Sequence, residues 1–207
     1  MEYLVFVIIV FGIYKFLNSL IRGILGEFKV RLKLFMLPSD KYKVLNDVLL
    51  KTKRGTTQID HIVVSIYGIF VIETKNYKGK IIGNGNDKDW IKEIHGNKYP
   101  FRNPIIQNKG HIRALAKNLK IDESVMTSMV VFLNDCKLNI KTISLVFHID
   151  RLLPIIRNKK NILLSESQVK SITDMIKKLN QKGLLAKINH IMYVKKREKR
   201  EKRIKAN

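Results

Sequence analysis

The chain is poor in the residues that cross-link or interrupt a protein: of 207 residues, one is cysteine, four are proline and one is tryptophan. A single cysteine excludes an intramolecular disulfide and a zinc site built from thiolates, and it favours a reducing compartment. No linker rich in Pro, Gly or Ser interrupts residues 25–190, so this stretch is predicted to be one domain. A hydrophobic fraction of 45% excludes wholesale disorder.

Acidic residues are also scarce, with 17 Asp and Glu against 40 Lys and Arg and a formal charge of +23. Such an excess predicts a polyanionic partner, either nucleic acid or an anionic membrane surface. The basic residues are 30 Lys and 10 Arg. Lys is a hydrated point charge that suits loose attraction to phosphate better than bidentate reading of bases. We therefore expect binding with little sequence preference.

The N-terminal stretch Tyr3–Ile21 contains nineteen residues and one charge, Lys15, which is the length that a membrane span needs. Basic residues such as Arg22 and Lys29 follow it, and the positive-inside rule then places the rest of the chain in the cytoplasm. We expect residues 1–22 to form a hydrophobic helix that anchors the protein in the cell membrane by a single pass. The alternative is a hydrophobic helix that docks on the domain or on a second copy.

The C-terminal stretch, residues 195–205, holds eight basic and two acidic residues. It predicts either a solvated charged helix or an arm that contacts nucleic acid or lipid headgroups. The organisation expected is therefore a hydrophobic helix at 1–22, a domain at 23–190 and a basic helix or tail at 191–207.

The middle of the chain is predicted to be an α/β domain with a mixed central sheet flanked by helices. The segments expected are a helix at Gly26–Leu37, strands at Tyr42–Leu50, Gln58–Ser65 and Ile69–Asn76, short strands at Lys80–Ile82 and Trp90–Ile94, a helix from Asn103-Pro104 to Asn118, strands at Met126–Leu133 and Thr142–Phe147, and a helix from Ser165 to Gln181.

One acid-x-Lys triplet, Glu73-Thr74-Lys75, stands out by its context. Composition alone predicts about two or three such triplets and the chain has three, so the pattern by itself carries little weight. Here, however, a tight turn ending at Gly68 joins two strands. In the pairing that this turn imposes, the numbers of two residues that face each other sum to about 133. That register places Asp60 opposite Glu73, on one face with Lys75.

Two carboxylates so close repel each other unless a cation lies between them. Mg²⁺ or Mn²⁺ is the natural ion to be bound by oxygen ligands. Lys75 on the same face can orient or activate a water and stabilise charge on a phosphate. The trio therefore suits hydrolysis of a phosphodiester. The alternative is a salt bridge between Lys75 and the two acids on an exposed sheet face.

The chain resembles the nuclease-related domain (NERD) family of the PD-(D/E)xK nuclease-like superfamily from about Gly26 to Leu119. The motifs that carry the resemblance are Gly26-Glu27, Gln58-Ile59-Asp60-His61, Gly68 through Asn76, and Asn103-Pro104 with Gln107. It implies a restriction-endonuclease-like core. Members of this family often carry a transmembrane segment.

Position by position, the resemblance implies that Asp60 and Glu73 are metal ligands and that Lys75 is the catalytic lysine. It makes Glu27 a carboxylate near the metal and Gln107 a polar residue at the edge of the site, reaching a phosphate or a water. The expected protein is a membrane-tethered, metal-dependent nuclease that acts on DNA rather than RNA. A non-catalytic nucleic-acid-binding module and a membrane-associated interaction module remain as alternatives, and the oligomeric state stays open.

Other chemically reactive side chains are given structural roles. His61 is expected to pack on the face opposite Asp60, and Trp90 and Phe101 to lie in the core. Tyr77 and Lys78 either contact the nucleic-acid backbone or form a turn. The remaining histidines show no metal-ligand spacing; they are His95, His111, His148 and His190.

Overall fold

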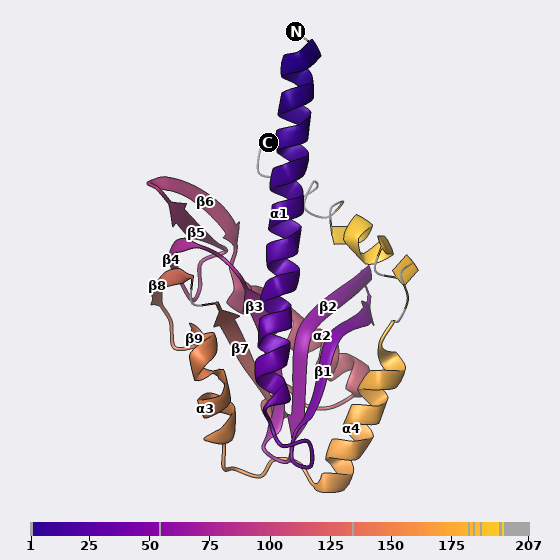
Figure 1. Ribbon diagram of the computed structural model, residues 1–207. Helices are drawn as coiled ribbons and strands as arrows, with labels where there is room; N and C mark the ends of the chain where they lie inside the picture. The colour runs from indigo at the N-terminus through magenta and orange to yellow at the C-terminus, as the bar shows by residue number, and fades with distance from the viewer. Residues whose placement is uncertain are drawn as a thin grey trace.

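The computed structural model describes residues 2–53, 55–133, 135–181, 183, 185–186, 188–194 and 196. Figure 1 shows the arrangement of the labelled elements. Their order is α1 Glu2–Phe35, β1 Lys43–Thr52, β2 Gly55–Ser65, β3 Gly68–Lys75, β4 Gly79–Asn84, β5 Asp89–Ile94, β6 Asn97–Arg102, α2 Pro104–Leu119, β7 Met126–Phe132, β8 Cys136–Lys141, β9 Leu145–His148, α3 Leu152–Arg157 and α4 Glu166–Leu179.

The strands form two mixed sheets. The first sheet has the order β1-β2-β3-β7-β9, antiparallel from β1 to β3 and parallel from β3 to β9. The second has the order β6-β5-β4-β8. The chain passes from the first sheet to the second twice, after β3 and after β7, and the Leu133 amide donates to the Lys75 carbonyl at this junction (3.0 Å). The expected α/β fold with helices flanking a mixed sheet is thus confirmed, with a second sheet added.

Helices cover both faces of the first sheet, so its central strands are apolar on both sides, as covered strands must be. On one face, Val30 and Leu34 of α1 pack with Phe70 of β3 and Leu152 of α3. On the other face, α2 and α4 pack against β1, β2 and β3. A third cluster around Trp90 joins the second sheet to β7 and the start of α2. These layers fix the ends of β2 and β3, where the candidate site lies.

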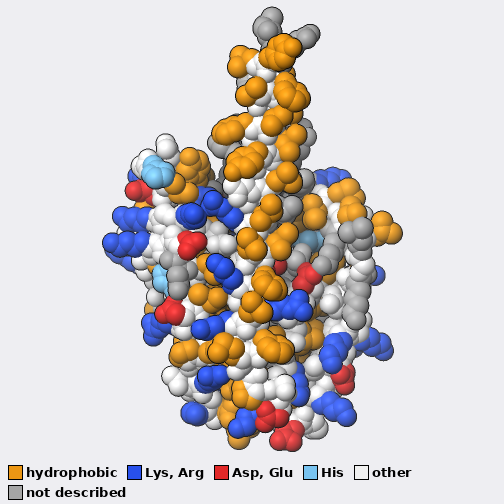
Figure 2. All heavy atoms as spheres, in the orientation of Figure 1, with side chains coloured by type: hydrophobic (Ala, Val, Ile, Leu, Met, Phe, Trp, Pro, Cys, Tyr) orange, Lys and Arg blue, Asp and Glu red, His pale blue; other side chains and the backbone are white. Residues whose placement is uncertain are grey.

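Helix α1 is one continuous helix of 34 residues, Glu2–Phe35, and it ends shortly before Pro38. Its C-terminal part packs on the sheet, and its N-terminal part projects beyond the body with exposed apolar side chains (Figures 1 and 2). Within the described residues, no helix is long and apolar enough to cross a membrane. The expectation of a single-pass membrane protein, with the localisation derived from it, is therefore wrong. The finding gives no support to a membrane contact through this helix.

Several elements differ from those expected. Strands β6 and β8, the two edges of the second sheet, were missed. β6 is largely exposed and contains Pro100, which an edge strand tolerates. β8 alternates apolar and polar residues, a strand signal that was overlooked. The short helix α3 was also missed. In contrast, the Asn103 cap of α2 and the capping box of Ser165 with Gln168 are confirmed. Most of the basic tail, residues 197–207, lies outside the described residues.

Candidate active site

The candidate site lies where β2 and β3 separate. The two strands pair from Ser65–Gly68 to His61–Ile72, so paired residue numbers sum to 133, as predicted. The pairing of the two strands stops one step before Asp60 and Glu73. There the Asp60 carboxylate accepts the Thr74 amide at 2.8 Å. A side chain thus takes an amide that could have served strand pairing, and the carboxylate is fixed at the strand ends.

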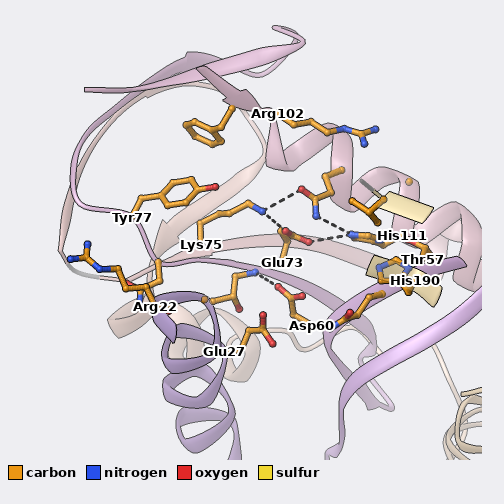
Figure 3. A pocket seen from close by; sticks show the side chains of 18 of the residues that line it. Arg22, Glu27, Thr57, Asp60, Glu73, Lys75, Tyr77, Arg102, His111 and His190 are labelled. Atoms are coloured by element: carbon orange, nitrogen blue, oxygen red, sulfur yellow. Dashed lines mark hydrogen bonds and ion pairs between the residues drawn. The ribbon is translucent and has the colours of Figure 1, made fainter. Parts of the chain in front are cut away.

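Glu73 is the centre of a buried hydrogen-bond network, with 2% of its surface exposed. The Lys75 ammonium donates to Glu73 Oε1 at 2.6 Å and to the Gln107 side-chain carbonyl at 3.3 Å. His111 Nε2 lies 3.2 Å from Glu73 Oε2. Figure 3 shows these contacts as dashed lines. Both carboxylate oxygens are therefore held by donors, which fixes the direction in which Glu73 faces.

His111 is a site residue that sequence reasoning missed. An ionised carboxylate only accepts, so the Nε2 that bonds Glu73 must carry the proton. The Thr57 hydroxyl lies 2.8 Å from His111 Nδ1 and can either donate or accept, so this contact is compatible with a proton on Nε2. Gln107 and His111 are four residues apart on α2, hence on one helix face. That spacing from Gln107 is the signal that would have identified His111.

Opposing effects act on the pKa of Glu73. Burial raises it, but the Lys75 ammonium and the His111 hydrogen bond outweigh burial and lower the pKa to about 2. For Lys75 the directions are opposite: burial lowers its pKa, and the negative charge of Glu73 raises it. The effect of Glu73 is larger, so the pKa of Lys75 lies above its usual value. The pair is therefore a carboxylate with an ammonium over the whole physiological pH range.

Asp60 shows the opposite behaviour. Burial raises its pKa well above the usual range, and the nearby carboxylates of Glu73 and Glu27 raise it further. Lys75 and the Thr74 amide lower it, but they do not compensate. Ionised Asp60 is thus poorly stabilised by its surroundings and would be favoured by an added cation.

Glu27 reaches the site because α1 comes very close to the end of β3. A Cβ on Gly26 would lie 2.7 Å from the Asn76 Cβ, so a larger residue would push the helix away. The Asn76 side-chain amide also donates to the Arg22 carbonyl at 2.7 Å. The motif pair Gly26-Glu27 therefore has a clear role: Gly26 permits the approach and Glu27 enters the pocket (Figure 3).

One cavity of about 1140 Å³ is lined by all the residues predicted for the site. They are Glu27, Asp60, Glu73, Lys75 and Gln107. The same cavity is lined by His111, Tyr77 and Lys78, and by His190 and Tyr193 from the C-terminal segment. The structure thus brings the candidate residues together, while their catalytic and metal-binding roles stay predictions.

The donor set fits a cation that needs few protein ligands. Among the described residues, no three His, Cys, Asp or Glu side chains are grouped as a metal-binding set. Mg²⁺, however, keeps several waters and is often bound through one or two carboxylates. Asp60 and Glu73 provide such a pair of oxygen donors, and Asp60 Oδ1 makes no hydrogen bond within the described part of the chain.

The roles given to neighbouring side chains can also be compared with the structure. His61 is 2% exposed, and its Nδ1 lies 2.7 Å from Asn46 Oδ1, so its predicted packing role is confirmed. Trp90 is fully buried, as expected, and its indole donates to the Asn84 carbonyl at 2.8 Å. His190, in contrast, lies at the cavity, with Nδ1 2.8 Å from the Thr56 hydroxyl.

Comparison with known proteins agrees with this geometry. The nuclease-related domain (NERD) family matches residues 22–133, a range that includes all five predicted site residues. An uncharacterised protein of Bacillus anthracis is 41% identical over 123 residues, which cover 56% of this chain and 58% of the relative's length. No solved structure matches the chain significantly. Because the family match covers more than half of the 207 residues, the chain belongs to the nuclease-related domain family.

Proposed function

We propose that the protein is a metal-dependent nuclease that hydrolyses phosphodiester bonds of DNA with little sequence preference. The observation that carries the proposal is the gathering of Asp60, Glu73 and Lys75 in one cavity at the ends of β2 and β3. Membership of the nuclease-related domain family supports a nuclease-like function.

Asp60 and Glu73 would hold the metal, Mg²⁺ or Mn²⁺, with Glu27 near them. When bound, such an ion supplies a Lewis acid that lowers the pKa of water and neutralises charge on the phosphate. Glu73 is kept ionised by Lys75 and His111, so it offers a charged oxygen without first losing a proton. Asp60 is kept in place by the Thr74 amide on one oxygen.

Lys75 acts as an ammonium, because the negative charge of Glu73 raises its pKa. An ammonium has no lone pair and cannot remove a proton from water. The ammonium can stabilise the negative charge that builds on the phosphate oxygens. It also fixes the orientation of the Gln107 side chain by donating to its carbonyl oxygen. This excludes Lys75 as the general base at neutral pH while it remains paired with Glu73.

The charge of the whole chain supports a polyanionic substrate. A net charge of +23 raises the local concentration of nucleic acid around the site. Three quarters of the basic residues are Lys, which attracts phosphate without the bidentate geometry that reads guanine. Contacts to phosphate position a nucleic acid without specifying its sequence.

The test is cleavage of supercoiled plasmid by the purified chain in Mg²⁺, with and without EDTA. We expect nicking that EDTA abolishes and that Lys75→Met lowers by roughly a hundredfold or more, the usual cost of losing one charge-stabilising group. Lys170→Met removes an exposed lysine of α4 and is the matched control. Asp60→Asn should abolish Mg²⁺-dependent activity.

The proposal fails if the wild-type chain leaves DNA intact, or if Lys75→Met cuts as fast as Lys170→Met. A parallel assay that compares single-stranded RNA with single-stranded DNA of the same length tests the preference for DNA. Equal cleavage of RNA would refute that preference and leave the hydrolytic site in place.

A further inference from the structure

We propose that the second sheet forms a binding wall for a single strand of nucleic acid, which runs from the hydrolytic site along β5 and β6. This surface, the β5–β6 wall, consists of Tyr77, Lys78, Lys92, Tyr99, Phe101 and Arg102. Its role as a route for the substrate rests on the proposed function, whereas the binding itself does not.

The wall is continuous with the candidate site. Tyr77 and Lys78 follow β3 directly, two and three residues after Lys75, and lead into β4. Lys92 of β5 and Arg102 of β6 line the same cavity as Glu73. A strand positioned at the carboxylates would therefore meet these side chains without leaving the cavity.

Apart from Lys75, which pairs with Glu73, the cations that line the cavity lie around the carboxylates. The three carboxylates, Glu27, Asp60 and Glu73, lie at the junction of α1, β2 and β3. The flanking cations Lys92 and Arg102 come from the second sheet, Lys78 comes from the loop before β4, and Arg22 comes from α1. Figure 3 shows Arg22 and Arg102 on different sides of the carboxylates. Cations beside a metal-binding centre attract the phosphates that flank a scissile bond.

The basic surface continues beyond the cavity. Lys and Arg side chains gather on the left of Figure 2, where Figure 1 places β4 to β6. Lys98 and Arg102 of β6 are exposed. Because β6 is an edge strand of the second sheet, a bound strand can lie along it without displacing another element.

Aromatic rings surround the cation Lys92, whose strand position is paired with Tyr99. The Lys92 ammonium lies 5.0 Å from the centre of the Tyr77 ring and 5.6 Å from that of Tyr99, so cation–π attraction holds it at the surface. Tyr77 packs edge-on against Phe101 at 4.9 Å, and 49% of Tyr99 is exposed. Positive grooves with aromatic side chains are the usual way in which proteins bind single strands.

The size of the cavity favours a single strand. Its volume of about 1140 Å³ lies slightly above the range of about 300–1,000 Å³ typical of small-molecule pockets. The space therefore suits a few nucleotides and is bounded by α1 on one side and the second sheet on the other. Unpaired bases present their faces to aromatic rings, whereas bases stacked in a duplex do not.

The test measures binding of the full chain to a fluorescein-labelled 20-nucleotide DNA strand by anisotropy, in EDTA and at several salt concentrations. Lys92→Ala/Arg102→Ala should weaken binding at least tenfold. It should also lower the slope of log affinity against log salt by about 1.4, since each phosphate contact on a single strand contributes about 0.7. The control pair, Lys170→Ala/Lys178→Ala, removes two exposed charges from α4 and should leave binding within twofold.

A second variant separates stacking from charge. Tyr99→Ala should weaken binding to the labelled strand about fivefold or more without changing the salt slope. A 20-base-pair duplex of the same sequence should bind more weakly than the single strand and respond less to Tyr99→Ala. Matching thermal melting curves for all variants will show that folding is preserved.

Three results would overturn the proposal: an equal loss in the α4 control pair, an unchanged salt slope in Lys92→Ala/Arg102→Ala, or a duplex that binds as tightly and with the same sensitivity to Tyr99→Ala. Failure of the nuclease function is distinguishable from these. It would appear as intact DNA in Mg²⁺ while the Lys92 and Arg102 variants still lose affinity for the strand.

Discussion

The ion pair between Glu73 and Lys75 should contribute measurably to stability as well as to chemistry. The Lys75 ammonium lies 2.6 Å from Glu73, with 15% and 3% of the two side chains exposed. The pKa of Glu73 is about 2 in the folded protein against 4.5 for the free side chain. A difference of 2.5 pKa units corresponds to about 3 kcal/mol at neutral pH.

The sign of the pH dependence follows from the direction of each shift. Because the folded pKa of Glu73 is depressed, its stabilising effect is complete above pH 4.5 and is lost as the pH falls toward about 2. The folded pKa of Lys75 is raised above 10.5, so its effect is present below pH 10.5 and is lost at higher pH. Stability from the pair should therefore be constant between these limits.

A double-mutant cycle measured by urea unfolding at pH 7 in EDTA tests this reasoning. Glu73→Gln leaves a buried ammonium without its partner, and Lys75→Met leaves a buried carboxylate with His111 alone. Each should cost about 3–5 kcal/mol of unfolding free energy. The double variant should cost clearly less than the sum, with a coupling energy of about 1–3 kcal/mol. A coupling below about 0.5 kcal/mol would refute the pair as a stabilising interaction.

Three further predictions concern the residues around the site. His111→Ala removes a donor to Glu73 and should lower the unfolding free energy by about 2–4 kcal/mol, with less loss in His111→Gln, as measured by urea titration. Gly83→Ala should lower the melting temperature, because a Cβ there meets the Trp90 ring, whereas Gly110→Ala in the open interior of α2 should raise stability by about 0.5–1 kcal/mol. Cys136 is buried with its pKa raised to about 11 by desolvation and then by Asp135; its alkylation at pH 7.5 should be slow until urea unfolds the chain.

The sequence predicted that Asp60, Glu73 and Lys75 lie together because the relations that place them are local. A short turn between two apolar strands fixes the register, and the pairing of His61 with Ile72 follows from the turn at Gly68. The approach of Glu27 was predicted by resemblance alone. Its physical cause, the contact of Gly26 with Asn76, joins positions fifty residues apart, and no local pattern reveals such a contact.

What the sequence did not predict depends on non-local packing. β6 is a largely exposed edge strand. β8 alternates apolar and polar residues, but it pairs with β4, which lies far away in sequence, so periodicity could not assemble the second sheet. His111 acquires its role from Thr57 and Glu73, which lie on strands far from α2 in sequence. The sequence left two roles open for Tyr77 because its contacts with Lys92 of β5 and Phe101 of β6 arise only when the second sheet is assembled.

The two acids at the strand ends, Asp60 and Glu73, lie in opposite electrostatic environments. Glu73 is surrounded by donors and is stable as a carboxylate, so it helps to hold the folded protein together in the absence of any metal. Asp60 is half-buried beside like charges, and within the described part of the chain its hydrogen-bond donor is the Thr74 backbone amide. Folding therefore leaves one carboxylate satisfied and its neighbour in need of a cation. If a metal ion binds here, most of the electrostatic gain should arise at Asp60, and the loss of metal affinity should be greater for Asp60→Asn than for Glu73→Gln.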